Sequence, residues 1–504
     1  MLDLVIKNAR VIDGTDSPWF RADVGIKDGF IAAVGKISED AKEYVDAEDN
    51  YLTPGFIDIH SHSDDGILEH PQNESRILQG VTTELCGNCG DSLAPNEKGL
   101  TMAEFLDTVE KAQPSTNFAM LVGHGTVRAI AMGYDDREPS EEELEKMRSL
   151  VRESMQGGAY GVSTGLIYPP GSYAKTDELI EVVKAVRDYD GFYATHMRGE
   201  GRPVISSTKE AIEIATKAGV PLEISHHKVT YKPDWQVSCF MTTALIERAR
   251  RNGLEVTCDQ YPYRASATSL SIDIPAWAFN GGVEALMERL KNEETRALIR
   301  DQMNASHIGR WGDIVVSYVS TEKNAWMAGM SIEAIAEKLG KDPADTLMDA
   351  VIEENNHIGE LDFDMCEEDI EHIMKRPYTM TGSDGSAMSL NRKGKPHPRN
   401  YGTFVRVLSH YCRDRQLFPI ETAVHKMTSL PASRLRLSDR GIIKQGMRAD
   451  LVLFNLNKLN DNPSFTNPQQ ACDGIMRVYV NGVLTAKDGA HTGARAGMVL
   501  RHKA

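Results

Sequence analysis

Five side chains of the kinds that bind metals follow short apolar segments of the chain. His60 and His62 end FIDIHSH, Cys89 follows TTELCGN, and His196 and His226 end FYATH and LEISH. In a strand, residues two apart point to the same face, so the imidazoles of His60 and His62 can approach one ion. Imidazole and thiolate donors favour zinc over magnesium or calcium. The sequence therefore predicts a zinc site.

An aspartate takes the corresponding place after another apolar segment. Asp384 follows YTMTGS, and the small residues around it leave room for water and substrate. An aspartate before glycine is also common in turns. Here, however, it completes a set of six polar side chains at the ends of five segments. We therefore expect Asp384 beside the metal, where it can exchange protons with water as general base and then general acid.

Two further residues near these candidates have simpler interpretations. Cys86 and Cys89 have the CxxC spacing of a redox pair or a zinc knuckle, but a knuckle needs a second ligand pair nearby, and the sequence offers none. A thiol-disulfide function remains a weaker hypothesis. His227 should point away from its neighbour His226 and is expected to be structural.

Alternating short apolar segments and amphipathic helical segments indicate parallel βα units. Eight such strands are the number for a closed (β/α)8 barrel, in which catalytic residues lie at the carboxyl ends of the strands. The eight segments are FIDIH, TTELCGNC, FAMLVGHG, AYGVSTGL, FYATHM, PLEISHH, EVTCDQYPY and YTMTGSD.

Both ends of the chain are rich in β-branched residues and turn signals, including an Asn-Gly pair at 481–482. We expect residues 1–53 and 437–504 to form one small β-sandwich domain, and residues 54–436 to form the barrel. The stretch between Tyr263 and Tyr378 is too long for a βα connection and has helical segments of its own. Residues at about 264–376 are therefore predicted to be an inserted lid subdomain.

The bulk composition excludes several kinds of partner. The 504 residues include 41% hydrophobic and 26% charged residues, and the net charge is −17. Nucleic acids and anionic membranes bind clustered cationic surface, so neither is an expected partner. No signal peptide and no membrane-spanning run is apparent, and the seven cysteines do not indicate a disulfide framework. We expect a cytoplasmic protein that acts on a small molecule.

Over essentially its whole length the chain resembles the D-aminoacylase (N-acyl-D-amino-acid deacylase) branch of the amidohydrolase superfamily. The closing GMRADLVLF is typical of the superfamily, whereas the GNCG and YPPG segments point to the deacylase branch. The matching stretches are PGFIDIHSHSD, QGVTTELCGNCGDSLAP, GAYGVSTGLIYPPGSYA, THMRGE, EISHHK, DQYPYRAS, GSDGSA, HPRNYGTFVRVL and KMTSLPASRLRLSDRGIIKQGMRADLVLF.

The resemblance implies one tightly bound zinc with an adjacent, weaker metal position. The residues implied for the tight site are Cys89, His196 and His226, and those for the weak site are His60, His62 and Asp384. Many cyclic-amide hydrolases of the superfamily bridge two metals with a carboxylated lysine on the fourth strand. The segment AYGVSTGL has no lysine, which favours the cysteine-containing deacylase site.

The resemblance also implies the activity, which is hydrolysis of N-acyl-D-amino acids. Lys228, Tyr261 and Tyr168 would bind the substrate's α-carboxylate. Gly199 stands where an acidic residue is more usual, so the orientation of His196 would depend on Glu200 or a backbone carbonyl.

Several alternatives stay open. A D-dipeptidase or cyclic-amide hydrolase could use the same scaffold, and a non-catalytic homologue is a weaker possibility. The preferred side chain, the acyl length, the number of metals and the oligomeric state are not determined by the sequence.

Overall fold

A computed structural model describes residues 1–503, and its centre is a set of parallel strands. Each of the eight predicted apolar segments contributes a strand; the third is split into β8 and β9, which only Leu121 separates. Most residues of these strands are buried, because helices cover their outer face. The strands are β6 (Phe56–Asp58), β7 (Val81–Cys86), β8 (Asn117–Met120), β9 (Val122–Gly123), β10 (Gly161–Gly165), β11 (Phe192–His196), β12 (Leu222–Ile224), β13 (Val256–Gln260) and β17 (Thr379–Thr381).

These strands form two parallel sheets, β6-β7-β8 and β17-β13-β12-β11-β10-β9. The first and last strands also meet. Ser61 and Gly385, just beyond β6 and β17, form a parallel bridge, and the Asp384 N–H donates to the His60 carbonyl at 2.8 Å. The central part of the chain therefore has the α/β organisation and the parallel strand order that the sequence predicts.

The helices between the strands begin where the sequence offers capping residues. At the start of α2, the Glu104 N–H donates to the Thr101 hydroxyl at 3.3 Å, and the Glu104 carboxylate accepts the Thr101 N–H at 2.9 Å. Ser140 and Glu143 repeat this capping box at α4, which satisfies backbone donors that a helix start otherwise leaves free. The connecting helices are α2 (Met102–Ala112), α3 (His124–Met132), α4 (Glu141–Gln156), α5 (Thr176–Val183), α6 (Val204–Ala218) and α7 (Ser238–Arg251).

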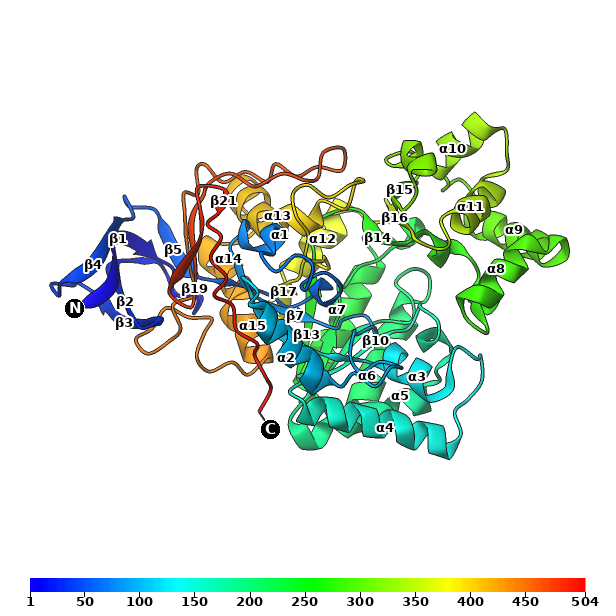
Figure 1. Cartoon of the computed structure of the whole chain (residues 1–504), viewed down its shortest axis with the longest axis horizontal. Coiled ribbons are helices and arrows are strands. Elements are labelled where there is room, and N and C mark those ends of the chain that lie inside the picture. Colours follow the sequence, from blue (N-terminus) through cyan, green and yellow to red (C-terminus); the bar gives the residue numbers. More distant parts are fainter. Residues whose placement is uncertain (504) are drawn as a thin grey trace.

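The two ends of the chain share one sheet, seen at the left of Figure 1. Eight of its nine strands follow one hydrogen-bonded path, and β4 branches from it by pairing with β1. The strand β1 pairs with two different strands on the same side, because its first half pairs with β4 and its last two residues pair with β5. Asn481 and Gly482 have φ of 49° and 82°, as the predicted tight turn between β19 and β20 requires. The strands are β1 (Leu2–Val11), β2 (Phe20–Lys27), β3 (Phe30–Gly35), β4 (Ala41–Asp46), β5 (Tyr51–Pro54), β18 (Leu451–Phe454), β19 (Ile475–Val480), β20 (Val483–Lys487) and β21 (Ala490–His491).

The segment between β13 and β17 builds a separate unit at the right of Figure 1. It has its own hydrophobic core, which includes Leu286, Ile299 and Ile314. Its three strands pair antiparallel in the order β14-β16-β15. The elements are β14 (Ser266–Ser269), α8 (Val283–Lys291), α9 (Glu293–Ser306), β15 (Ile314–Val319), α10 (Ile332–Leu339), α11 (Pro343–Glu353) and β16 (Ile358–Asp362).

The last helix expected in this insertion lies elsewhere. α12 (Glu367–Met374) packs against α7, β13 and β17, and its apolar side chains belong to other cores than that of the insertion. It covers the parallel strands, as a connecting helix of a βα unit does. Among the described helices, none is long and apolar enough to cross a bilayer.

Candidate active site

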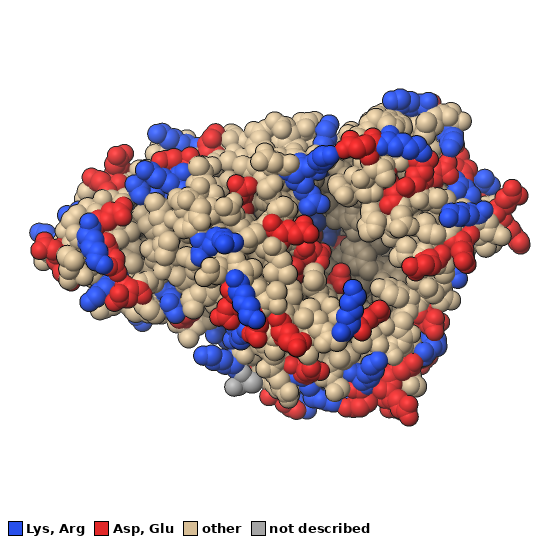
Figure 2. All heavy atoms as spheres, in the orientation of Figure 1, with Lys and Arg blue, Asp and Glu red and all other residues tan. Residues whose placement is uncertain are grey.

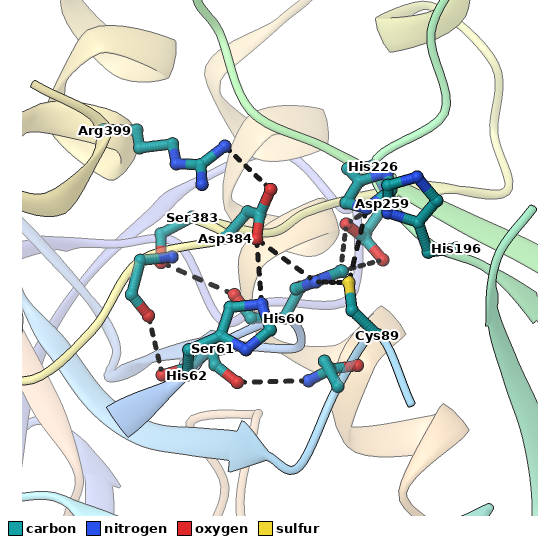
Figure 3. Close-up of polar contacts among 12 residues, drawn as sticks. His60, Ser61, His62, Cys89, His196, His226, Asp259, Ser383, Asp384 and Arg399 are labelled. Atoms are coloured by element: carbon teal, nitrogen blue, oxygen red, sulfur yellow. Dashed lines mark hydrogen bonds and ion pairs between the residues drawn. The ribbon is translucent and has the colours of Figure 1, made fainter. Parts of the chain in front are cut away.

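The six predicted polar residues meet at the carboxyl ends of the parallel strands. His60 and His62 follow β6, Cys89 follows β7, and His226 follows β12. His196 is the last residue of β11, and Asp384 follows β17. Their ligand atoms form two groups within which all atoms lie no more than 4.8 Å apart, and the groups share Cys89 (Figure 3). The members of the first are Cys89, His196 and His226, and those of the second are His60, His62, Cys89 and Asp384.

The first group has the donor chemistry of a zinc site. Cys89 Sγ lies 3.4 Å from His226 Nε2, and the rings of His196 and His226 are 4.3 Å apart. His196 is 4% exposed, and neither of its ring nitrogens has a hydrogen-bond partner in the described structure. Buried polar atoms are seldom left without a partner. An ion between these donors would supply it, so the residues fit zinc.

Burial sets the protonation of these donors. It holds the pKa of His196 and of His226 well below the usual value, so both imidazoles are neutral, as metal ligands must be. Burial also raises the pKa of the Cys89 thiol to about 11. A thiolate at this position therefore depends on a bound cation.

The second group is centred on Asp384. Its Oδ1 lies 3.0 Å from His62 Nε2 and 3.5 Å from His60 Nε2, and its Oδ2 lies 2.7 Å from Arg399 Nη1. Burial alone would raise the pKa of Asp384, but Arg399, His60 and His62 together hold that pKa well below its ordinary value. The carboxylate is therefore ionised and can accept a proton.

Two carboxylates lie against the histidines: Glu200, which the sequence offered as a support for His196, and Asp259, which it did not single out. Asp259, in β13, accepts the His226 backbone N–H at 2.9 Å and lies 3.1 Å from His60 Nδ1. Glu200 Oε1 lies 3.0 Å from His226 Nδ1, and Oε2 lies 3.4 Å from His196 Nε2. Such partners fix the ring orientation of metal-binding histidines. Glu200 thus contacts His196, as the unusual Gly199 suggested, but lies closer to His226.

The backbone at the site is unusual. Cys89, His226 and Asp384 have φ of 54°, 35° and 52°, a region that costs non-glycine residues about 1–3 kcal/mol each and is often found at functional sites. The glycine after Cys89 is required by close packing, since a Cβ on Gly90 would lie 2.4 Å from the Gly165 nitrogen. Cys86 is buried in the hydrophobic core and is a free thiol, like Cys89.

The residues expected to bind substrate line the same cavity, but they differ in what they contact. Tyr261 OH is buried without a hydrogen-bond partner in the described structure. Tyr168 OH accepts the Thr268 hydroxyl at 3.2 Å, and its ring lies 5.2 Å from that of His196. Lys228 Nζ already lies 2.7 Å from Glu200 Oε1 and 2.8 Å from His226 Nδ1, so Lys228 is committed to those groups.

Arg399 is a cavity residue that the sequence analysis did not assign. Its guanidinium lies 4.8 Å from the centre of the Tyr261 ring, and its Nε is buried without a hydrogen-bond partner in the described structure. It lies at the start of α13 (Arg399–Arg406). A search for polar residues at the carboxyl ends of strands therefore could not have found it.

The cavity has a volume of about 1210 Å³ and separates the strand ends from the insertion. Figure 2 shows its mouth as a hollow beside the insertion. Residues from the parallel strands, such as Cys89 and Asp384, and from the insertion, such as Ser317 and Glu360, line it together. A small molecule in this cavity would therefore contact both parts.

Comparisons with known proteins agree with this geometry. Residues 43–486 match the model of the amidohydrolase family. D-aminoacylase from Alcaligenes xylosoxydans xylosoxydans is 36% identical over 100% of this chain and 98% of its own length. N-acyl-D-glutamate deacylase from the same organism is 34% identical over 100% and 97%. The crystal structure of N-acyl-D-glutamate deacylase from Bordetella bronchiseptica, complexed with zinc and a phosphonate inhibitor that mimics the tetrahedral intermediate, superimposes with a TM-score of 0.84 at 31% identity and covers 99% of both chains.

The chain belongs to the amidohydrolase family. Within that family, it falls in the branch of D-aminoacylase and the N-acyl-D-amino acid deacylases. The resemblance drawn from the motifs is thus confirmed.

Proposed function

We propose that this chain is a zinc-dependent hydrolase that cleaves the amide bond of N-acyl-D-amino acids. The observation that carries the proposal is the convergence of Cys89, His196 and His226 with the ionised carboxylate of Asp384 at one cavity. The full-length relatives that hydrolyse such substrates support it. The products would be a carboxylate and a free D-amino acid.

The proposal assigns a different role to each part of the chain. Residues 54–436 would form a (β/α)8 barrel, and the bridge between Ser61 and Gly385 supports its closure. The insertion, from about residue 264 to the residues just after β16 and without α12, would act as a lid over the cavity, which its residues help to line. Residues 1–53 and 437–504 would form the small β domain.

Cys89, His196 and His226 would hold the tightly bound zinc, and His60, His62 and Asp384 would line a weaker position. When bound, zinc supplies Lewis acidity that polarises a carbonyl and lowers the pKa of a water.

Asp384 would carry the proton during hydrolysis. As water attacks the acyl carbon, the Asp384 carboxylate would accept the proton that water loses. The same carboxyl group would then donate this proton to the leaving nitrogen when the carbon–nitrogen bond breaks. Its contact with Arg399 at 2.7 Å supports this role, because the guanidinium keeps the carboxylate ionised and oriented before the reaction.

Arg399 and Tyr261 are the groups we propose for the substrate's α-carboxylate. Both have buried donors without partners in the described structure, and both line the cavity. Donors of this kind suit a carboxylate, and a guanidinium binds one strongly. Tyr168 would border the same region. Lys228 would contribute mainly through Glu200 and His226, which it already contacts.

Paired D and L N-acetyl amino acids test the proposal directly. The zinc-loaded protein should release the free amino acid from D substrates, and treatment with a chelator should abolish this activity until zinc is restored. Dipeptides with D residues, hydantoins and dihydropyrimidines should be poor substrates. Turnover of L substrates at rates equal to D substrates, or of hydantoins alone, would contradict the proposal.

A further inference from the structure

The wall of the cavity formed by the insertion is acidic. Asp273, Glu360, Asp362 and Asp364 all line the cavity. The strand pairing explains why several of them share one face. Glu360 lies opposite Thr268, and Asp362 lies opposite Ser266 in the antiparallel pair of β14 and β16. Residues two apart in a strand point to the same side, so Glu360 and Asp362 face the same way.

This face is directed toward the proposed active site. The Thr268 hydroxyl donates to Tyr168 OH at 3.2 Å, and the Tyr168 ring lies 5.2 Å from that of His196. The Ser266 hydroxyl donates to Asp364 Oδ2 at 3.3 Å. A substrate held at the strand ends would therefore extend its side chain toward these carboxylates.

Two of the four carboxylates have partners within the protein. Asp362 binds Arg310 Nη2 through both oxygens, at 2.7 Å and 2.5 Å, and Asp273 Oδ1 lies 2.9 Å from His307 Nε2. These pairs show how the wall accommodates a guanidinium or an imidazolium. They leave the other two carboxylates without a cation.

Glu360 and Asp364 are the two that form no ion pair in the described structure, although Asp364 Oδ2 accepts the Ser266 hydroxyl. They are 3% and 5% exposed, and Glu360 Oε2 and Asp364 Oδ1 have no hydrogen-bond partner in the described structure. Burial, together with the neighbouring acidic groups, raises the pKa of both well above the ordinary value. Without a cation beside it, a buried carboxyl group of this kind stays protonated. Two of them at a cavity wall point to a ligand whose cationic group would ionise and bind them.

A single metal ion does not fit this wall. Within residues 1–503, the only groups of three or more potential ligand atoms that lie close enough together for one ion are the two centred on Cys89 and Asp384. Among the described residues, no three carboxylates of the insertion lie that close together. An extended organic cation, with donors that reach several oxygens, suits them better.

We propose that the cavity accepts N-acyl-D-amino acids with a cationic side chain, and that Glu360 and Asp364 bind that cation. This inference rests on the proposed function, since it specifies which side chain the deacylase takes. Arg399 and Tyr261 would bind the α-carboxylate at one end of the substrate. The acidic wall would bind a guanidinium or ammonium group at the other end.

A neutral substrate of the same size and shape as the cationic one shows whether the cavity recognises the charge of the side chain or only its shape. Nα-acetyl-D-arginine and Nα-acetyl-D-citrulline differ in a guanidinium and a ureido group of nearly equal size. The wild-type protein should hydrolyse the arginine substrate with a kcat/KM about tenfold or more above that for citrulline. Nα-acetyl-D-lysine should also exceed Nα-acetyl-D-norleucine. Equal or higher efficiency with the neutral substrates would overturn the inference.

Variants of the wall give a second test. Glu360→Gln and Asp364→Asn should each lower kcat/KM for the arginine substrate about tenfold or more, while the citrulline value stays within about threefold. Glu337→Gln removes the same charge from an exposed position on α10 of the insertion and should change neither value. An equal loss for both substrates in the wall variants would show a structural role and contradict charge recognition.

The two proposals fail in different ways. Hydrolysis of Nα-acetyl-D-leucine without any hydrolysis of the arginine and lysine substrates would overturn the cationic preference and leave the deacylase assignment intact. Absence of turnover with every N-acetyl-D-amino acid, in protein of full zinc content, would overturn the assignment itself. The wild-type comparison needs no variant, so a variant that fails to fold does not prevent a decision.

Discussion

Asp259 offers a sharp test of the metal site, because it supports ligands without belonging to either group of them. Its Oδ1 accepts the His226 backbone N–H at 2.9 Å and lies 3.1 Å from His60 Nδ1, and its Oδ2 lies 3.2 Å from the same nitrogen. In Asp259→Asn, the amide oxygen can keep the bond to His226. The amide oxygen also stays within reach of His60 Nδ1. The negative charge is lost, however, and the amide nitrogen that replaces Oδ2 is a second donor facing that ring nitrogen.

The expected loss of zinc affinity follows from the weakened contact between residue 259 and His60. A hydrogen bond to a charged group contributes about 1.5–3 kcal/mol, which corresponds to roughly a tenfold to hundredfold change in an equilibrium constant. Loss of an outer partner of a metal-binding histidine usually costs about the same in affinity or activity. We expect zinc at the position lined by His60, His62 and Asp384 to bind about ten to a hundred times more weakly. The zinc held by Cys89, His196 and His226 should remain.

Zinc titration against a chromophoric chelator, with elemental analysis of the dialysed protein, measures both sites. Asp369→Asn is a matched control, because Asp369 is also buried and accepts the Gln236 N–H at 2.9 Å, away from the site. The control should bind zinc like the wild type. Unchanged zinc affinity in Asp259→Asn, or an equal loss in both variants, would refute the role of Asp259 as an orienting partner.

Three other predictions follow from the structure. Cys89→Ala should lose the tightly bound zinc, because the thiolate is shared by both ligand groups; full zinc stoichiometry by elemental analysis would contradict this. Asp384→Asn, compared at equal occupancy of the tight zinc, should lower kcat about a hundredfold or more, as expected for loss of a general base, and turnover within tenfold of wild type would remove Asp384 from that role. Although burial alone would raise the pKa of Glu354, hydrogen bonds from Ser320, Thr321 and Asn324 lower it to about 2 from 4.5. This carboxylate therefore contributes up to about 3 kcal/mol of stability above pH 4.5, which is lost as the pH falls toward 2. In Glu354→Gln, the insertion should unfold at a lower urea concentration than in the wild type at pH 7, and this difference in midpoint should narrow toward pH 3.5. Fluorescence can follow the unfolding, because the insertion holds three of the five tryptophans in the chain. A difference in midpoint that does not depend on pH would contradict the role of the carboxylate.

Local pattern was sufficient to find the strands and most of the site. Apolar segments bounded by turns predict strands, and parallel strands in consecutive βα units bring their carboxyl ends to one side. His60, His62, Cys89, His196, His226 and Asp384 could therefore be predicted to meet, although they are scattered over more than 300 residues. The turn at Asn481 was equally predictable, because two positive φ angles favour Asn-Gly.

Other features depended on which segments pack together. Asp259 lies within a predicted strand, yet only the packing of β13 beside β12 shows that its carboxylate reaches two histidines. Arg399 reaches Asp384 from a helix after the last strand, and Lys228 is paired with Glu200 across two loops. The helix at 367–374 joins the parallel strands because its apolar face finds their core.

The sequence by itself determined the parallel strands, the zinc-type donors and the family, because each depends on residues close together in the chain or on motifs in a fixed order. Only the tertiary structure decided that Asp259 supports two histidines, and which acidic side chains of the insertion face the cavity without an ion pair. Periodicity states which face of a strand a residue occupies, but not what that face will meet. The segment that packs against a given face is determined by the packing free energy of the whole chain, which cannot be read from any one local segment.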